Sequence, residues 1–214
     1  MNGHPFFKKV LVADDHPIIF LALVDMLDSI RGKDVVEIET VTNGDDLMRK
    51  LEESWDCLVL DMYMPGKLRS IPLLRAARGL QPSLRIIVYS GAINPCLTQV
   101  ALEEGASAYV SKASGPEVVV EALRAVSQNE RFVDPAIDLA EARRHPWNRL
   151  TPGECSVLVA LARGDHLQAI AIDSERSYKT ITAHKYNALR KLGLRSKEDV
   201  GHYLERTGLG YLLD

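Results

Sequence analysis

The chain has 214 residues, of which 46% are hydrophobic and 26% charged, as in an ordinary globular protein of one large or two small domains. No apolar run approaches the roughly 20 residues that span a bilayer, so we expect neither a membrane anchor nor a signal peptide. The three scattered cysteines give no zinc-binding pattern and suit a cytoplasmic protein with reduced thiols.

The net charge of −3 conceals an asymmetry along the chain. Residues 1–130 hold 18 acidic and 13 basic side chains, whereas residues 145–214 hold 8 acidic and 10 basic side chains. From Arg176 to Lys197 there are seven Lys or Arg residues and no Asp or Glu. An acidic first part and a locally basic second part indicate two different tasks.

Short apolar, β-branched runs alternate with amphipathic stretches over the first 128 residues. Such alternation is typical of βαβ units, so we expect an α/β fold with a five-stranded, doubly wound parallel sheet. We expect the helix at 45–52 to be capped by Asn43-Gly44. The expected strands are 10–13, 35–41, 57–60, 85–89 and 108–110, and the expected helices are 18–27, 45–52, 71–78, 97–103 and 116–126.

The pattern changes after residue 128. Phe132-Val133-Asp134-Pro135 interrupts the alternation, and we interpret residues 129–148 as a linker that contains one short helix at 136–144. Residues 149–214 are predicted to be all helical. The expected helices there are 152–163, 167–173, 177–192 and 197–205, in a small bundle of helix-turn-helix type.

Polar residues follow four of the predicted strands: Asp14 and Asp15, then Asp61, Ser90 and Lys112. The carboxyl ends of parallel strands line one crevice, so these side chains should converge there. Converging carboxylates repel each other unless a cation neutralises them, and Mg²⁺ prefers such oxygen ligands. A carboxylate can also attack a phosphoryl group, whose developing charge needs donors such as an ammonium and a hydroxyl. The sequence therefore predicts a site for a divalent cation and a phosphoryl group.

The segments VLVADDHP, LVLDMYMPG, IIVYSGA and AYVSKAS, in this order, resemble the signature blocks of response-regulator receiver domains over residues 8–128. The resemblance implies the sheet order 2-1-3-4-5, and it makes Asp61 the acceptor of a phosphoryl group from a histidine kinase or phosphotransfer protein. It also implies the remaining roles in the site: Mg²⁺ held by Asp14, Asp15, Asp61 and the backbone carbonyl of Tyr63, phosphoryl contacts from Ser90 and Lys112, and Tyr109 as an aromatic switch. His16 is a candidate for a base or a phosphate carrier. Because it directly precedes Pro17 at the start of a predicted helix, however, we interpret it as a capping or rim residue.

The predicted helix 177–192 is basic and amphipathic. Its inner face carries Ile181, His184, Ala188, Leu189 and Leu192, which leaves the opposite face free to enter a DNA major groove. Candidate contacts with base edges are Thr182, Ala183 and Tyr186, and candidate phosphate contacts are Lys179, Lys185, Arg190 and Lys191. A solvated charged helix normally mixes both signs, so the absence of acids favours a nucleic-acid surface.

LTPGE, VALARG and SYKTITAHKYNALRKLGLRS are similar to the LuxR/FixJ-type helix-turn-helix over about residues 149–206. Together with the receiver this implies the NarL/FixJ architecture, with a pattern that leans toward its RcsB-like members. Three places depart from the family pattern: Gly153 replaces a basic residue, Ala169 replaces an acid, and residues 174–176 are less apolar than usual. These departures affect the first helix of the motif or its packing.

We therefore predict a cytoplasmic DNA-binding response regulator that is not an enzyme. We expect it to bind double-stranded DNA as a homodimer, with a heterodimer as the alternative. Other readings are a receiver that works without phosphate under the control of partner proteins, and a helix-turn-helix that binds protein. A Mg²⁺-dependent phosphatase with Asp61 as nucleophile lacks support, because Tyr63 stands where a second acid would be needed.

Overall fold

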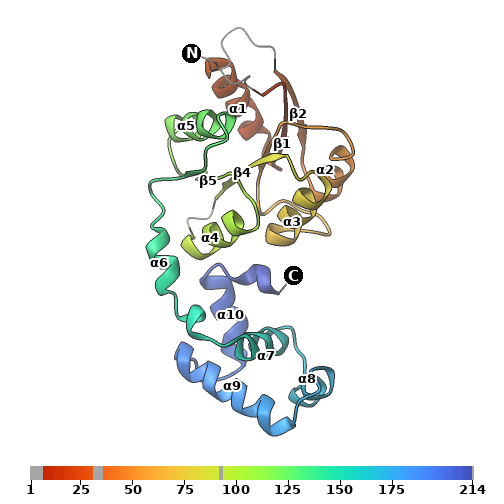
Figure 1. The fold of residues 1–214 in the computed structure, drawn as a ribbon, viewed down its shortest axis with the longest axis vertical. Helices are drawn as coiled ribbons and strands as arrows, with labels where there is room; N and C mark the ends of the chain where they lie inside the picture. Colours follow the sequence, from red (N-terminus) through yellow and green to blue (C-terminus); the bar gives the residue numbers. More distant parts are fainter. Residues whose placement is uncertain (1–6, 31–35, 92–93, 214) are drawn as a thin grey trace. The chain divides into compact units, whose positions relative to one another are not determined.

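The computed structural model describes residues 7–30, 36–91 and 94–213, and the chain divides into two compact units, residues 1–138 and 139–214. The first unit is an α/β sandwich and the second is helical (Figure 1). The strands of the first unit are β1 (Lys9–Ala13), β2 (Glu37–Val41), β3 (Cys57–Leu60), β4 (Arg85–Ser90), β5 (Ala108–Ser111) and β6 (Phe132–Val133). The helices of the first unit are α1 (Pro17–Ile30), α2 (Gly44–Lys50), α3 (Ser70–Leu80), α4 (Pro95–Glu103) and α5 (Pro116–Ser127).

All strand pairs are parallel, in the order β2-β1-β3-β4-β5-β6. The predicted α/β class and the order 2-1-3-4-5 are confirmed. The predicted number of strands was wrong, because Phe132 pairs with Ala108 and Val133 with Tyr109 as a sixth strand. A strand of two residues is too short to give a recognisable sequence pattern. Only the pairing with β5 shows that Phe132 and Val133 form a strand.

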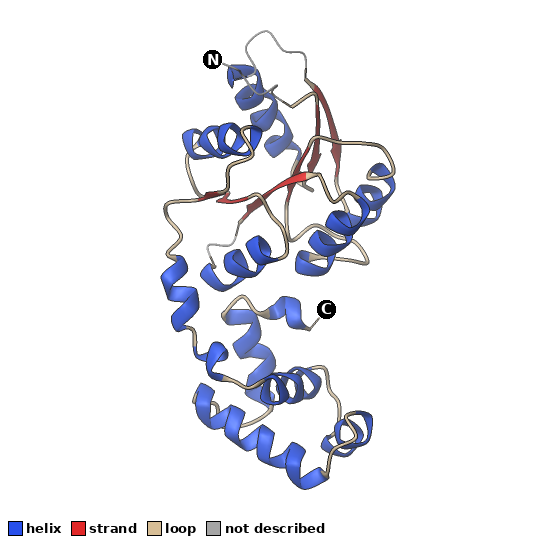
Figure 2. Cartoon of the chain, in the orientation of Figure 1, coloured by secondary structure: helices blue, strands red, loops and turns tan. Residues whose placement is uncertain are grey.

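Helices cover both faces of the sheet (Figure 2). Successive strand side chains point to opposite faces. Val10, Val12 and Val59 therefore join the apolar cluster of α1 and α5, in which Leu27 and Leu123 are fully buried. Helices α2, α3 and α4 cover the other face. A sheet that is covered on both sides needs near-continuous apolar strands, as the four buried residues of β3 show.

Local capping fixes several helix starts. Asn43 caps α2 as predicted, and its Oδ1 accepts a hydrogen bond from Asp46 N at 2.9 Å. Thr151 and Glu154 form a reciprocal capping box at the start of the first long helix of the second unit. Ser177 caps the basic helix, which ends at Gly193 with the left-handed φ of 68° that favours glycine.

The second unit contains the four predicted helices. They are α7 (Pro152–Ala162), α8 (Leu167–Asp173), α9 (Tyr178–Leu192) and α10 (Glu198–Arg206). The unit begins with α6 (Leu139–Arg144), shorter than predicted, and the 3₁₀ turn η1 (Pro146–Arg149), and it ends with the turn η2 (Gly210–Leu212). Leu158, Ala188, Val200 and Leu204 are fully buried, and they fix α9 with its basic face outward.

Candidate functional site

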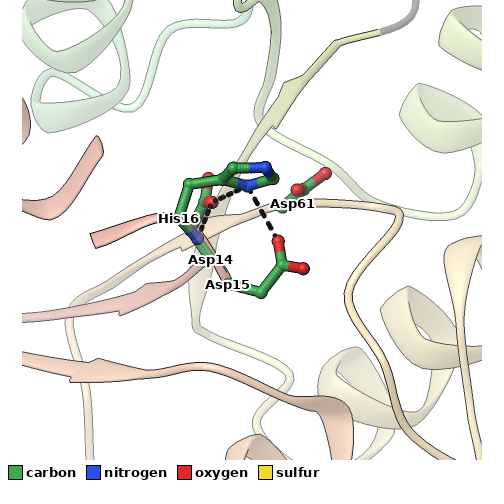
Figure 3. Close-up of side chains that lie close together, drawn as sticks. All are labelled: Asp14, Asp15, His16 and Asp61. Atoms are coloured by element: carbon green, nitrogen blue, oxygen red, sulfur yellow. Dashed lines mark hydrogen bonds and ion pairs between the residues drawn. The ribbon is translucent and has the colours of Figure 1, made fainter. Parts of the chain in front are cut away.

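Two buried carboxylates lie side by side at the carboxyl edge of the sheet. Asp14 follows β1 and Asp61 follows β3, and their side chains meet because Asp61 N donates to Ala13 O at 2.8 Å. They are only 5% and 4% exposed. Asp15 and His16 lie beside them but are exposed (Figure 3). One potential ligand atom from each of these four residues lies within 4.8 Å of the others.

Lys112 joins the two buried carboxylates. Its Nζ lies 2.6 Å from Asp14 Oδ2 and 2.7 Å from Asp61 Oδ2. Burial disfavours the charged ammonium, but the bonds to both carboxylates outweigh burial and raise the pKa of Lys112 above its ordinary value. The sheet holds Lys112 in place, since its backbone N donates to Ser90 O at 2.8 Å. The sequence prediction that these groups converge is confirmed for Asp14, Asp61 and Lys112.

Ser90 and Tyr109 lie inside the fold beside this site. Both are fully buried, at the end of β4 and within β5. The Tyr109 hydroxyl shares hydrogen bonds with Ser90 and Thr98, and burial raises the pKa of Tyr109 to about 12 despite these bonds. The phenol is therefore neutral at ordinary pH and directly linked to the predicted phosphoryl-contacting hydroxyl.

The donor set suits a hard divalent cation. Carboxylate oxygens of Asp14, Asp15 and Asp61 gather in one place, and such oxygens are the ligands that Mg²⁺ and Ca²⁺ accept. Tyr63 N donates to Asp61 Oδ1 at 3.1 Å, so the chain after Asp61 bends back toward the site. Tyr63 itself is largely exposed.

Sequence reasoning missed Asp134. This residue is 1% exposed and accepts hydrogen bonds from Ser111 N at 3.0 Å, Ser114 Oγ at 2.5 Å and Ala136 N at 2.9 Å. Burial raises the pKa of Asp134, but these bonds outweigh burial and hold it below its ordinary value. Asp134 thus ties the loop that carries Lys112 to the segment that leaves the sheet. Its only sequence signal is an acid before Pro135.

The basic helix α9 presents an uneven surface. Lys179, Ala183, Tyr186 and Arg190 are exposed, whereas Thr182 and Lys185 are half-buried. The Lys185 ammonium lies 4.4 Å from the centre of the exposed Tyr186 ring, so the two side chains form a cation–π pair. Thr182 Oγ1 is buried without a hydrogen-bond partner in the described part of the chain, so its hydroxyl is turned away from solvent.

Lys191 differs from the other cations of α9. Its Nζ lies 2.7 Å from Glu154 Oε2 and donates to Arg149 O at 3.1 Å. Lys191 was predicted to hold DNA phosphate, but its ammonium is engaged within the unit. The cause is tertiary: the fold places the start of α7 beside the end of α9.

Arg176 is a second residue whose surroundings the sequence does not reveal. Its guanidinium lies over Gly153, where a Cβ would come within 2.9 Å of Arg176 Nη1 and 3.2 Å of His184 Nε2. Arg176 Nη1 and His184 Nε2 are 3.3 Å apart, and Arg176 is exposed. The departures at Gly153 and Arg176 are therefore coupled, because the absent side chain of one makes room for the cation of the other.

We predict that Glu154→Gln lowers the free energy of unfolding of the second unit by about 2 kcal/mol, because Lys191 loses a charged acceptor. Burial raises the pKa of Glu154, but Lys191 and Thr151 outweigh burial and hold it below 4.5. This stabilisation is therefore present above pH 4.5 and is lost as the pH falls through the depressed folded pKa. The free energy of unfolding is measured by urea unfolding followed by Trp147 fluorescence, in a Trp55→Phe background that removes the other tryptophan. A difference from the parent that persists undiminished at about pH 3 contradicts the assignment.

Comparison with known proteins covers both units. The profile of the response regulator receiver domain family matches residues 10–124, and that of the luxR family of bacterial regulatory proteins matches residues 148–204. The transcriptional regulatory protein RcsB of Escherichia coli strain K12 is 31% identical over 208 residues, which cover 94% of this chain and 95% of that protein. None of the helices in the described parts of this chain is long and apolar enough to cross a membrane.

Solved structures of RcsB are similar over most of the chain. RcsB from Salmonella enterica serovar Typhimurium, bound to the promoter P1flhDC with phosphomimetic BeF3⁻, aligns with a TM-score of 0.67 at 30% identity, over 92% of this chain and 97% of that one. A structure of two RcsB dimers bound to two parallel DNAs aligns with a TM-score of 0.64 at 28% identity, over 92% of this chain and 98% of that one.

Proposed function

The chain belongs to the response regulators that join a receiver domain to a LuxR-family DNA-binding domain, and on that basis we propose that phosphorylation of Asp61 controls its binding to DNA. The observation that carries this proposal is the buried Asp61 carboxylate held 2.7 Å from Lys112 Nζ, beside a second buried acid. We assign residues 1–138 to the receiver, which extends the predicted 1–128 by β6, and residues 149–214 to the DNA-binding domain.

A histidine kinase or phosphotransfer protein is the proposed donor. An Asp61 carboxylate oxygen attacks the phosphorus, the P–N bond to the donor imidazole breaks, and the imidazole leaves with the electron pair and takes up a proton. Asp14, Asp15, Asp61 and the carbonyl of Tyr63 would hold Mg²⁺, which would neutralise charge on the phosphoryl oxygens when bound. Lys112 and Ser90 supply the remaining cation and hydroxyl.

The hydrogen bond between Ser90 and Tyr109 could transmit a change at the phosphorylation site to the protein surface. An aspartyl phosphate carries about −1.5 to −2 charges on its phosphoryl oxygens in place of the single charge of the carboxylate, and these oxygens draw Lys112 and Ser90 toward them. Movement of Ser90 breaks or remakes its hydrogen bond to the Tyr109 hydroxyl, and the fully buried Tyr109 ring must then repack beneath α4. The face built by α4 and α5 then differs between two states, and phosphate selects one of them.

One experiment tests this function and its alternatives. DNA fragments are titrated with the full chain, with and without a small phosphodonor and Mg²⁺, while phosphate incorporation is followed in parallel. We expect incorporation, a shift toward dimers and tighter DNA binding. DNA binding that ignores the phosphodonor supports a phosphate-independent receiver governed by partner proteins. The absence of DNA binding supports a protein-binding helix-turn-helix, and multiple turnover of phosphoesters supports an enzyme.

The proposed DNA surface is the exposed side of α9 together with Arg176. RcsB structures contain dimers on DNA, and we propose that this chain likewise binds double-stranded DNA as a homodimer, with half-sites about one helical turn apart. Lys179, Lys185, Arg190 and Arg176 would hold phosphates, while Ala183 and Tyr186 would face the bases. Lys191 is left out because Glu154 holds it. We place the protein in the cytoplasm with its DNA target.

Replacing a phosphate-binding cation should weaken DNA binding equally for all sequences. We expect Lys185→Ala and Arg176→Ala each to reduce affinity several-fold and to lower the slope of log affinity against log salt by about 1. Fluorescence anisotropy at several salt concentrations measures both quantities. Lys8→Ala, which removes an exposed lysine of the receiver, is the matched control. An unchanged slope for both variants removes α9 and Arg176 from the contact surface.

A further inference from the structure

A pocket of about 420 Å³ lies at the amino end of the sheet, at the edge opposite the one that carries Asp61. Three arginines line it, and we call it the arginine pocket: Arg78 from the last turn of α3, Arg85 at the start of β4 and Arg131 just before β6. They meet because β4, β5 and β6 are parallel neighbours whose amino ends share one edge. The pocket has the size of sites that hold small organic molecules.

Arg78 is fixed against the backbone. Its Nη1 donates to Pro82 O at 2.8 Å, and its Nη2 donates to Gly105 O. Gly105 has a left-handed φ of 101°, and a Cβ there would come within 2.8 Å of Arg78 Nε. This Nε is buried without a hydrogen-bond partner among the described residues, and burial lowers the pKa of the Arg78 guanidinium. A neutral side chain would avoid this cost, which favours a role for the charge itself.

Arg85 and Arg131 complete the cationic wall. Arg85 Nε donates to Asp56 O at 3.2 Å, and its Nη1 donates to Ser127 O at 3.3 Å. Its guanidinium also lies 4.7 Å from the centre of the Phe7 ring. These contacts fix the orientation of Arg85 but do not neutralise it, because backbone carbonyls carry no net charge. Arg131 is exposed and has neither a hydrogen bond nor an ion pair from its side chain to any described residue.

The charge of the arginine pocket is not balanced from within the described chain. None of the three arginines forms an ion pair with a described carboxylate, and Glu130 is the one acid among the described lining residues. Three arginines against one glutamate leave a formal charge of +2. A phosphate monoester carries about −1.5 to −2 charges on oxygens that point in several directions, so guanidinium groups on different sides can bind it together. A single carboxylate is already satisfied by one bidentate arginine.

The rest of the lining suits an organic group. Val126 and Ala106 contribute buried apolar side chains, while Ser107 and Asn129 add a hydroxyl and an amide. A free phosphate ion would leave these groups without contacts. Small-molecule sites commonly combine an apolar wall with a few polar groups that orient the ligand.

We propose that the arginine pocket binds a small organic phosphate. The phosphate group lies between the three arginines, and the organic part lies against the apolar wall beside Ser107. This site lies at the opposite edge of the sheet from Asp61, and its ligand is bound without transfer of the phosphoryl group. The proposal therefore goes beyond the proposed function and does not depend on it.

Calorimetric titration of the full chain with ribose 5-phosphate tests the proposal, in chelator so that no Mg²⁺ draws phosphate toward Asp61. We expect ribose 5-phosphate to bind more tightly than inorganic phosphate and ribose not to bind, because the charge and the organic part both contribute. Added salt should weaken the binding. Succinate should bind more weakly than ribose 5-phosphate, and succinate binding that is equal or tighter overturns the assignment to phosphate.

Two neighbouring substitutions should change the affinity for ribose 5-phosphate in opposite directions. Arg131→Ala should lower it by about 10-fold, because one charged hydrogen bond is lost. Glu130→Gln should raise it several-fold, because it removes the acid that opposes the bound phosphate. Both side chains are exposed, so the fold should tolerate both changes. Arg124→Ala, which removes an exposed arginine of α5 outside the pocket lining, is the matched control.

Arg78→Lys and Arg85→Lys keep the positive charge but lose the guanidinium fork, and each should weaken the binding of ribose 5-phosphate. Asp61→Asn should bind it as the parent does, even if the phosphorylation proposed for Asp61 fails. No binding, or binding that Arg131→Ala and Glu130→Gln leave unchanged, overturns the proposal. Binding that is lost in Asp61→Asn places the ligand at the phosphorylation site and overturns it as well.

Discussion

Asp61→Asn is expected to reduce phosphate incorporation from a small phosphodonor in Mg²⁺ to background. The asparagine amide has nearly the same shape as the carboxylate, so the packing around a side chain that is 4% exposed should survive. It carries no negative charge, however, and its oxygen is a poor nucleophile toward phosphorus. Incorporation of radiolabelled phosphate and a mobility shift on phosphate-affinity gels measure the loss.

Asp45→Asn provides the control, because Asp45 is an exposed acid of the same unit at the start of α2. It should incorporate phosphate as the unsubstituted protein does. The DNA affinity of Asp61→Asn should no longer respond to the phosphodonor. Incorporation that survives the substitution means that another side chain is the acceptor, and the role proposed for Asp61 is then lost.

Lys112→Met has the second large effect, on both phosphorylation and stability. Methionine keeps the apolar stem but removes the ammonium that lies within 2.7 Å of the two buried carboxylates. Without this cation the charge of the transferring phosphoryl group is less well stabilised, so we expect phosphorylation to slow by about 10²- to 10³-fold. The same change leaves two buried charges uncompensated, at a cost of about 3 kcal/mol in the free energy of unfolding.

Denaturant unfolding in chelator and in Mg²⁺ separates the two effects. Part of the lost stability should return with Mg²⁺, because the cation takes over neutralisation of Asp14 and Asp61. Pairing raises the folded-state pKa of Lys112, so its contribution is fully present below its ordinary value of 10.5 and is lost only as the pH rises through the raised pKa. A variant as stable as the parent in chelator at neutral pH refutes the pairing.

The sequence by itself determined the architecture and the convergence of Asp14, Asp61 and Lys112 at one edge of the sheet. Apolar β-branched runs alternating with amphipathic stretches predict parallel strands, and parallel strands bring their carboxyl ends to one edge. Asp14, Asp61 and Lys112 each lie one residue beyond a strand, so their meeting follows from topology alone. The four helices of the second unit followed in the same way from local patterns, caps and glycines.

Only the tertiary structure decided which polar side chains are free and which are engaged. Lys191 is held by Glu154, Arg176 lies over Gly153, and Asp134 accepts from Ser111 and Ser114. The sixth strand exists only because β5 offers it a partner. In each case the partners are between 20 and 37 residues apart. Secondary structure follows from local spacing, whereas such contacts depend on how whole elements pack, which no short sequence pattern records.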